Sequence, residues 1–229
     1  MSNIIIVGGA PFPQEGDNRT RQQALNELAG YIGGENNPDV VDFCGTVWDS
    51  AARDMNLDKV WEFNRKSQDI TLLANTSEYQ LADDFNEPEV ANTLNASGNE
   101  VDEVGFIPFL EWRELFTEQI SAASAVPLYY TIEFKHAVGK VRFEPRLGPV
   151  LSYPKVRLRY FSRVKPASGL GDRLAVPYEM DQAIFKHAVA HVIAKRRSAE
   201  EAAGYFADAR DAMAAVERKF RVWPDYLGR

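Results

Sequence analysis

Three short runs of alternating residues between Leu128 and Phe161 constrain the fold of this chain more than any other feature. Every second position in these runs is apolar: Leu128, Tyr130, Ile132 and Phe134; then Val141 and Phe143; then Val156, Leu158 and Tyr160. A period of two is typical of strands that bury one face. Gly139 and the segment 145–149 provide the reversals between them. We therefore predict an antiparallel sheet here, with helices before and after it.

Helical periodicity flanks this sheet on both sides. Apolar residues recur every three to four positions and predict helices over 18–32, 39–56, 178–197 and 199–220. Ser198, with Glu201 three residues later, is a capping box for the last of them. The apolar face of the third is broad, so we predict that it is the central packing element.

The segment between the helices carries further strand signals. The alternation from Gln68 to Leu81 predicts a hairpin, and residues 89–107 predict one or two more strands. Between them, Asp83, Asp84, Glu87 and Glu89 predict a solvated acidic loop. A short helix with an aromatic stripe is expected after Pro108, packed on one end of the sheet.

Together these elements predict an α+β fold. Its parts are N-terminal helices, an antiparallel, sandwich-like β-rich middle, and two long C-terminal helices packed with the N-terminal ones. The length of 229 residues suits one large domain or two small ones. We expect a single domain over 1–229: an arm and N-terminal helices in 1–66, a β-rich insertion in 67–170, and C-terminal helices with a tail in 171–229.

Composition excludes several classes of protein. A net charge of −7 argues against a protein that wraps duplex DNA, which needs a basic surface. The single cysteine, Cys44, excludes an intramolecular disulfide and lies in an apolar helical stripe, where a small core side chain is favoured over a nucleophile. Apolar runs are too short for a membrane helix or a signal peptide. We expect a protein of the cytoplasm, or of a particle assembled there.

Enzyme motifs are scarce. The glycines after the run Ile4–Val7 do not form the pattern G-x-G-x-x-G, so an extended arm is favoured over a nucleotide-binding turn. Neither the serine elbow G-x-S-x-G nor a phosphate loop occurs. We expect no catalytic residue, no cofactor and no metal.

His187 and His191 are one helical turn apart, a spacing that can share a zinc ion. A metalloprotease would need glutamate where Ala188 stands, and His136 is the only other histidine. Two interpretations stay open: a pair of polar residues at the rim of a helix face, and a zinc-dependent or carboxylate/histidine hydrolase.

Basic residues form three clusters, which are Arg157, Arg159, Arg163 and Lys165; Lys195, Arg196 and Arg197; and Arg218, Lys219 and Arg221. The last two end helices, where cations offset the helix dipole. Alternating arginines on a strand predict a positive stripe on its exposed face. Charge segregated in this way suits complementary contacts between subunits.

The chain ends in a tail, 222–229, in which Pro224 prevents the last helix from continuing. Its large aromatic residues are of the kind that anchor a partner surface. We expect the tail to dock on a neighbouring molecule and to contribute little to folding. The candidate interface residues are Trp223, Tyr226, Arg218, Lys219, Arg221, Arg157 and Arg159.

The order of helices, β-rich middle and paired C-terminal helices resembles the head-to-tail adaptor (connector) proteins of tailed bacteriophages. The residues that carry the resemblance span about two thirds of the chain. They are Trp61-Glu-Phe63, Tyr79 to Phe85, Pro127 to Ile132, Gly139 to Pro145, Leu158 to Phe161, Val176 to Tyr178 and Ala203 to Phe206. Ala82 departs from the family, which often has proline there.

The resemblance implies a structural virion protein without a catalytic site. Such adaptors are typically dodecameric rings beneath the portal, in the neck between capsid and tail, and are assembled in the host cytoplasm. The expected partners are other copies of the chain, the portal protein, and downstream tail or nozzle proteins. DNA passes through the channel without sequence-specific binding, and no membrane is involved. A hydrolase using His187 and His191, and a monomeric binding or chaperone-like protein, are the alternatives.

Overall fold

A computed structural model describes residues 18–54, 60–116, 123–135, 138–220 and 222–223. These residues divide into two compact units. Residues 65–162 form the sheet unit, and residues 18–64 with 163–223 form the helical unit. The expected N-terminal arm lies outside the described residues.

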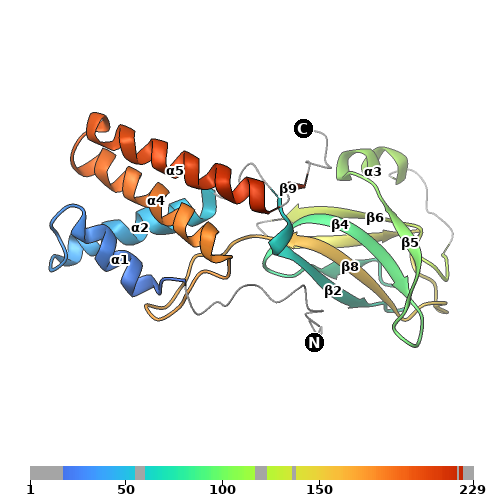
Figure 1. Ribbon diagram of the computed structural model, residues 1–229. Coiled ribbons are helices and arrows are strands. Elements are labelled where there is room, and N and C mark those ends of the chain that lie inside the picture. The colour runs from blue at the N-terminus through green and yellow to red at the C-terminus, as the bar shows by residue number, and fades with distance from the viewer. Residues whose placement is uncertain (1–17, 55–59, 117–122, 136–137, 221, 224–229) are drawn as a thin grey trace. The chain divides into compact units, whose positions relative to one another are not determined.

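The helical unit contains all four long helices expected from the sequence (Figure 1). They are α1 (Arg21–Gly30), α2 (Pro38–Asp54), α4 (Tyr178–Arg196) and α5 (Ala199–Lys219). The turn η2 (Glu62–Asn64) follows the short strand β1 (Val60–Trp61). β1 pairs antiparallel with β9 (Val222–Trp223).

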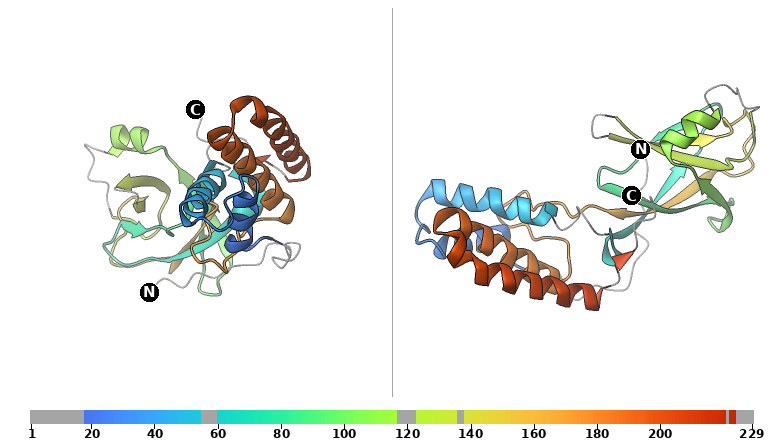
Figure 2. Two further views of the ribbon diagram at one scale, coloured as in Figure 1. Left: turned by 90° about the vertical axis from the view of Figure 1, so that its left-hand side faces the viewer. Right: turned by 90° about the horizontal axis from the view of Figure 1, so that it is seen from above.

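Helix α4 is the central packing element of this unit, as predicted, because α1, α2 and α5 all contact it (Figure 2). Its broad apolar face is completely buried at Met180, Ile184, Ala188 and Val192. None of the described helices is long and apolar enough to cross a membrane.

Side-chain caps define where two of these helices begin. Thr20 and Gln23 form a reciprocal capping box at α1. At α5, the Ser198 hydroxyl accepts a hydrogen bond from the Glu201 backbone N–H at 3.0 Å, as predicted. The Glu201 carboxylate lies 3.7 Å from Arg197.

Seven strands form one curled sheet in the sheet unit. They are β2 (Arg65–Thr71), β3 (Glu78–Gln80), β4 (Phe85–Leu94), β5 (Glu100–Phe106), β6 (Tyr129–Lys135), β7 (Val138–Glu144) and β8 (Lys155–Ser162), in the order β2-β8-β4-β5-β6-β7-β3. Among the seven described strands, only β5 and β6 pair in parallel, and α3 (Phe109–Phe116) lies between them in sequence. The α+β fold class and the largely antiparallel middle are confirmed.

The predicted hairpin over 68–81 is wrong. β2 and β3 stand at opposite ends of the strand order, where β2 pairs with β8 and β3 pairs with β7. The curl of the sheet still brings these edges together, where the Tyr79 hydroxyl of β3 accepts from the Leu73 N–H at 2.9 Å and Gln68 adds two further hydrogen bonds. The buried Gln68 donates from Nε2 to the Gln80 carbonyl at 3.1 Å and accepts from the Ala82 N–H at 3.0 Å.

The predicted acidic loop is also partly wrong, because β4 begins at Phe85 and includes Glu87 and Glu89. Glu89 forms an ion pair with Arg65 of β2. Just before β4, Asp84 accepts hydrogen bonds from the Lys66 ammonium group at 2.6 Å and from the Tyr160 hydroxyl at 2.9 Å. Cations from β2 therefore hold carboxylates that the sequence alone assigns to solvent.

Candidate functional site

The two arginines of β8 do not form a free positive stripe. Arg157 makes a bidentate pair with Asp69 of β2, at 2.7 Å and 2.9 Å, which raises the pKa of Arg157. Arg159 lies 2.5 Å from Glu100 of β5, and Glu100 is also 3.7 Å from Arg157. Two carboxylates therefore balance two guanidinium groups on this face, and the predicted positive stripe is wrong.

Cations at the helix C-termini are largely used within the helical unit. Lys219 at the end of α5 forms an ion pair with Glu179 in the first turn of α4, which lowers the pKa of Glu179. Arg197 donates to the Tyr31 carbonyl at 2.6 Å, and the Arg196 guanidinium lies 4.4 Å from the centre of the Phe43 ring. Arg218 is exposed.

The start of the tail belongs to the fold of its own chain. Val222 and Trp223 form strand β9, whose partner is Val60–Trp61. The Trp61 side chain is buried and stacks on Phe63 at 5.7 Å, and Phe63 in turn meets Phe220. Arg221 and Tyr226 lie outside the described residues.

His187 and His191 bring their Nε2 atoms to 3.1 Å from each other. The Phe206 ring of α5 packs edge-on against His191, and the Asp54 carboxylate of α2 is 4.0 Å from His187 Nε2. Burial and the neighbouring His191 lower the pKa of His187, while Asp54 acts in the opposite direction. Across the described ranges, no group of three or more His, Cys, Asp or Glu side chains is arranged to hold a metal ion.

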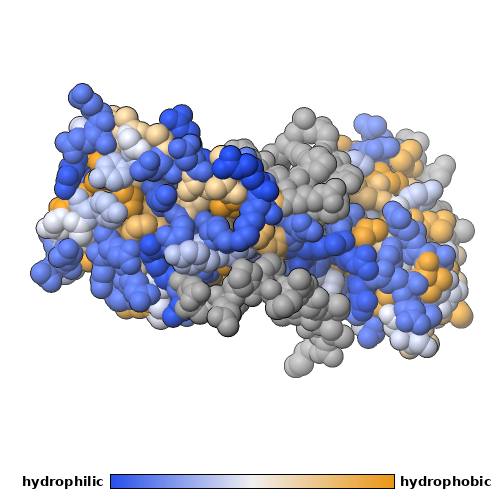
Figure 3. Space-filling view, viewed as in Figure 1, coloured by the Kyte–Doolittle hydropathy of each residue, from blue (hydrophilic) through white to orange (hydrophobic). Residues whose placement is uncertain are grey.

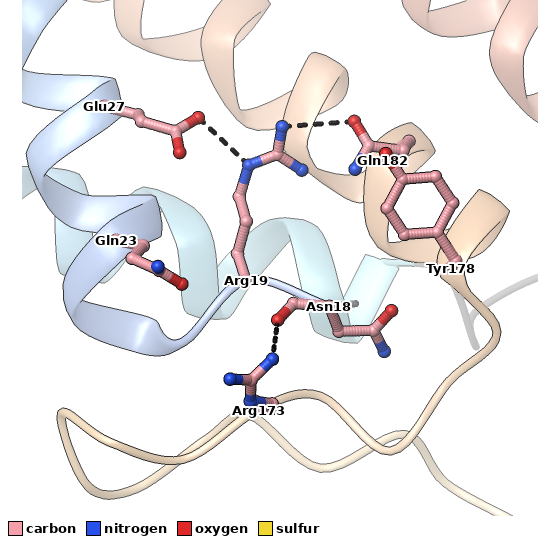
Figure 4. A pocket seen from close by; sticks show the side chains of 7 residues that line it. All are labelled: Asn18, Arg19, Gln23, Glu27, Arg173, Tyr178 and Gln182. Atoms are coloured by element: carbon pink, nitrogen blue, oxygen red, sulfur yellow. Dashed lines mark hydrogen bonds and ion pairs between the residues drawn. The ribbon is translucent and has the colours of Figure 1, made fainter. Parts of the chain in front are cut away.

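A polar pocket of about 360 Å³ lies beside the starts of α1 and α4 (Figure 4). Arg19 dominates it and is held by Asp181 and Gln182, each at 3.1 Å, and by Glu27 at 3.0 Å. Asp181 is fully buried, which raises the pKa of its carboxyl group. Arg19 is thus committed to joining the two helix starts, and Glu27, the carboxylate of the lining, is paired with it.

Helix α3 presents apolar side chains on the surface of the sheet unit (Figure 3). None of its eight residues is buried; Leu110 and Leu115 are 73% and 52% exposed. Trp112 and Phe116 pack in an aromatic row that continues to Tyr129 of β6. The aromatic stripe therefore holds α3 on the sheet unit while its leucines face outwards.

A family model described as SU10 adaptor protein matches residues 19–226, which is most of the chain. The chain belongs to the SU10 adaptor protein family. This confirms the resemblance noted from the sequence, and membership of an adaptor family implies a structural role. No curated protein matches the adaptor.

Two solved structures resemble the adaptor at low similarity. A chain from the neck of a native GTA particle, computed with C12 symmetry, is 11% identical, with 85% of the adaptor and 96% of that chain covered. A chain from the neck of an empty GTA particle, computed with C6 symmetry, is 12% identical, with 82% and 83% covered. Both have a TM-score of 0.31.

Sequence reasoning missed the side chains that neutralise or hold the candidate residues. Asp69 and Glu100 occupy the strands that flank β8 and β4, and Asp181 is the buried partner of Arg19. No local pattern marks these carboxylates, because each meets its cation across 59 to 162 residues of sequence.

Proposed function

We propose that the adaptor forms a ring beneath the portal of a tailed bacteriophage, extends the DNA channel and docks the tail. The single observation that carries this proposal is the adaptor-family match over residues 19–226. The ring would be a dodecamer in the neck of the virion, assembled in the host cytoplasm. Within it, residues 1–229 would act as one adaptor domain.

The charge of the chain supports a channel that does not bind DNA tightly. Twelve subunits at −7 each would carry a formal charge of −84. Affinity for phosphate comes from unpaired cations. Arg157 and Arg159 are balanced by Asp69 and Glu100, so this face adds no net positive charge. DNA would therefore slide past such a surface during ejection.

Ring formation needs two different complementary faces on each subunit. The exposed leucines of α3 supply apolar surface of the kind that subunit contacts bury. Arg218 and the residues after Trp223 supply a second candidate surface. We propose that these surfaces, which include Tyr226 of the tail, and Arg221 just before it, face neighbouring subunits or the portal protein.

The test is negative-stain imaging and solution mass of the purified adaptor, alone and with portal rings. We expect twelvefold rings on the portal. A monomer that ignores the portal would contradict the proposal and favour the binding-protein alternative. Hydrolysis that is lost in His187→Ala, with folding intact, would instead support the enzyme alternative.

A matched pair of variants locates the ring contact. Leu110→Ser with Leu115→Ser should prevent ring formation and leave the melting temperature nearly unchanged, because neither side chain is buried. Val101→Ser, at a 49% exposed position on β5, is the control for losing an exposed apolar side chain elsewhere on the sheet unit. Rings that form normally with the double variant would exclude α3 from the contact.

A further inference from the structure

The histidine pair of α4 has no role in the proposed ring. His187 and His191 lie on one face of the helix, one turn apart, and α2 and α5 each contribute one neighbour. The His187 side chain is 28% exposed, so small solutes reach it. Asp54 from α2 is the charged group beside it, and the Phe206 ring from α5 lies 5.1 Å from the centre of the His191 ring.

The separation of the two Nε2 atoms is that of two ligands on one metal ion. Imidazole nitrogen binds zinc at about 2.0–2.1 Å, so two such bonds at angles between right and tetrahedral place the nitrogens about 2.9–3.4 Å apart. The observed distance is 3.1 Å. The same distance also fits a hydrogen bond in which one imidazole donates its N–H to the other. A metal titration distinguishes these two arrangements.

The surroundings favour a bound cation. A neutral imidazole carries the lone pair that a metal needs. The Asp54 carboxylate, 4.0 Å from His187 Nε2, is close enough to offset part of the charge of an ion. Imidazole is the preferred ligand of Zn²⁺, Ni²⁺ and Cu²⁺ rather than of Mg²⁺ or Ca²⁺.

We propose that His187 and His191 form a non-catalytic binding site for a transition-metal dication, with water completing the coordination and Asp54 compensating its charge. This departs from the expectation of no metal drawn from the sequence. The site differs from a hydrolytic centre, because Ala188 stands where a metalloprotease has its general base. A bound ion would stabilise the helical unit, because it binds the folded arrangement of the two imidazoles and not the unfolded chain.

The test is calorimetric titration of the untagged, chelator-treated adaptor with ZnCl₂ and, separately, NiCl₂. We expect one saturable site per subunit. His187→Gln and His191→Gln should each weaken binding at least tenfold, and Asp54→Asn should weaken it several-fold. His136→Gln is the matched control, since it removes the remaining histidine, and it should leave the affinity unchanged.

Circular dichroism first confirms that each variant is folded. Cu²⁺ electron paramagnetic resonance then reports the ligands directly, and two coordinated imidazole nitrogens are expected in the wild type and one in each single variant. Absence of saturable metal binding to the wild type would overturn the proposal. Undiminished metal binding to a folded variant that carries both His187→Gln and His191→Gln would also overturn it. Ring assembly is scored separately by imaging, so failure of the metal site and failure of the ring proposal are distinguishable.

Discussion

Ile184 lies in the middle of α4 with no exposed surface, so the residue scale offers a direct test of the helical core. Ile184→Ala should destabilise the adaptor by about 2–4 kcal/mol, through lost burial and the cavity left behind. Lys186→Ala, two residues on and exposed, should change the stability by less than about 0.5 kcal/mol. Urea unfolding followed by circular dichroism measures both, and equal effects would show that α4 is not the packing centre.

His187 makes the stability of the helical unit depend on pH. Its pKa is lowered from the ordinary value of 6.5 by burial and by His191, with Asp54 opposing. A histidine whose pKa is lower in the folded state than in the unfolded state contributes stability at pH values above its unfolded pKa. That stability is lost as the pH falls through the folded-state pKa. The melting temperature should therefore drop as pH falls below 6.5.

The measurement is thermal unfolding of the chelator-treated adaptor at about pH 7.5 and pH 5.5, on either side of the ordinary histidine pKa. His187→Gln should show a smaller drop than the wild type, because it cannot take up the proton. An identical drop in the variant would assign the pH dependence to other groups.

At the scale of elements, Gln68 is one of the side chains that close the curled sheet. Gln68 bridges β2 to the residues at the end of β3 through two hydrogen bonds, although these strands are not paired with each other. Gln68→Ala should cost about 1–3 kcal/mol, because it leaves a partly buried carbonyl and N–H without their partner. Gln80→Ala removes an exposed side chain and is the control. Chemical denaturation that fails to separate the two variants would contradict this role.

At the scale of the whole molecule, the tail divides into two parts with different expected roles. Val222 and Trp223 pair with β1 in the same chain, whereas the residues from Pro224 onwards are proposed to dock on a partner. A chain that stops after Trp223 should keep its melting temperature and lose binding to portal rings. A chain that stops after Arg221 also lacks β9 and should melt about 2–4 °C lower, the shift expected for about 1 kcal/mol at this size.

Pull-down on portal rings and thermal unfolding, run on both truncations, separate these roles. If the chain that stops after Trp223 still binds portal rings fully, the residues from Pro224 onwards are not needed for assembly. An unchanged melting temperature in the shorter chain would show that β9 adds nothing to folding.

The sequence by itself determined the features that depend on neighbouring positions. The alternation at Val156, Leu158 and Tyr160 predicted a strand whose inward side chains are indeed at most 1% exposed. The capping residue Ser198 predicted the start of α5, and the wide apolar face of α4 predicted its central place. Backbone geometry repeats every two or 3.6 residues, so these patterns can be recognised within one segment.

Tertiary structure alone decided which segments meet. A strand with the right alternation can pair with many partners, so no local sequence pattern indicates that β2 pairs with β8 instead of β3. For the same reason Arg157 and Arg159 suggested a positive stripe until the fold placed Asp69 and Glu100 beside them. Strand pairing and ion pairing both join residues far apart in sequence, where the outcome depends on competition among all the surfaces that the chain must bury.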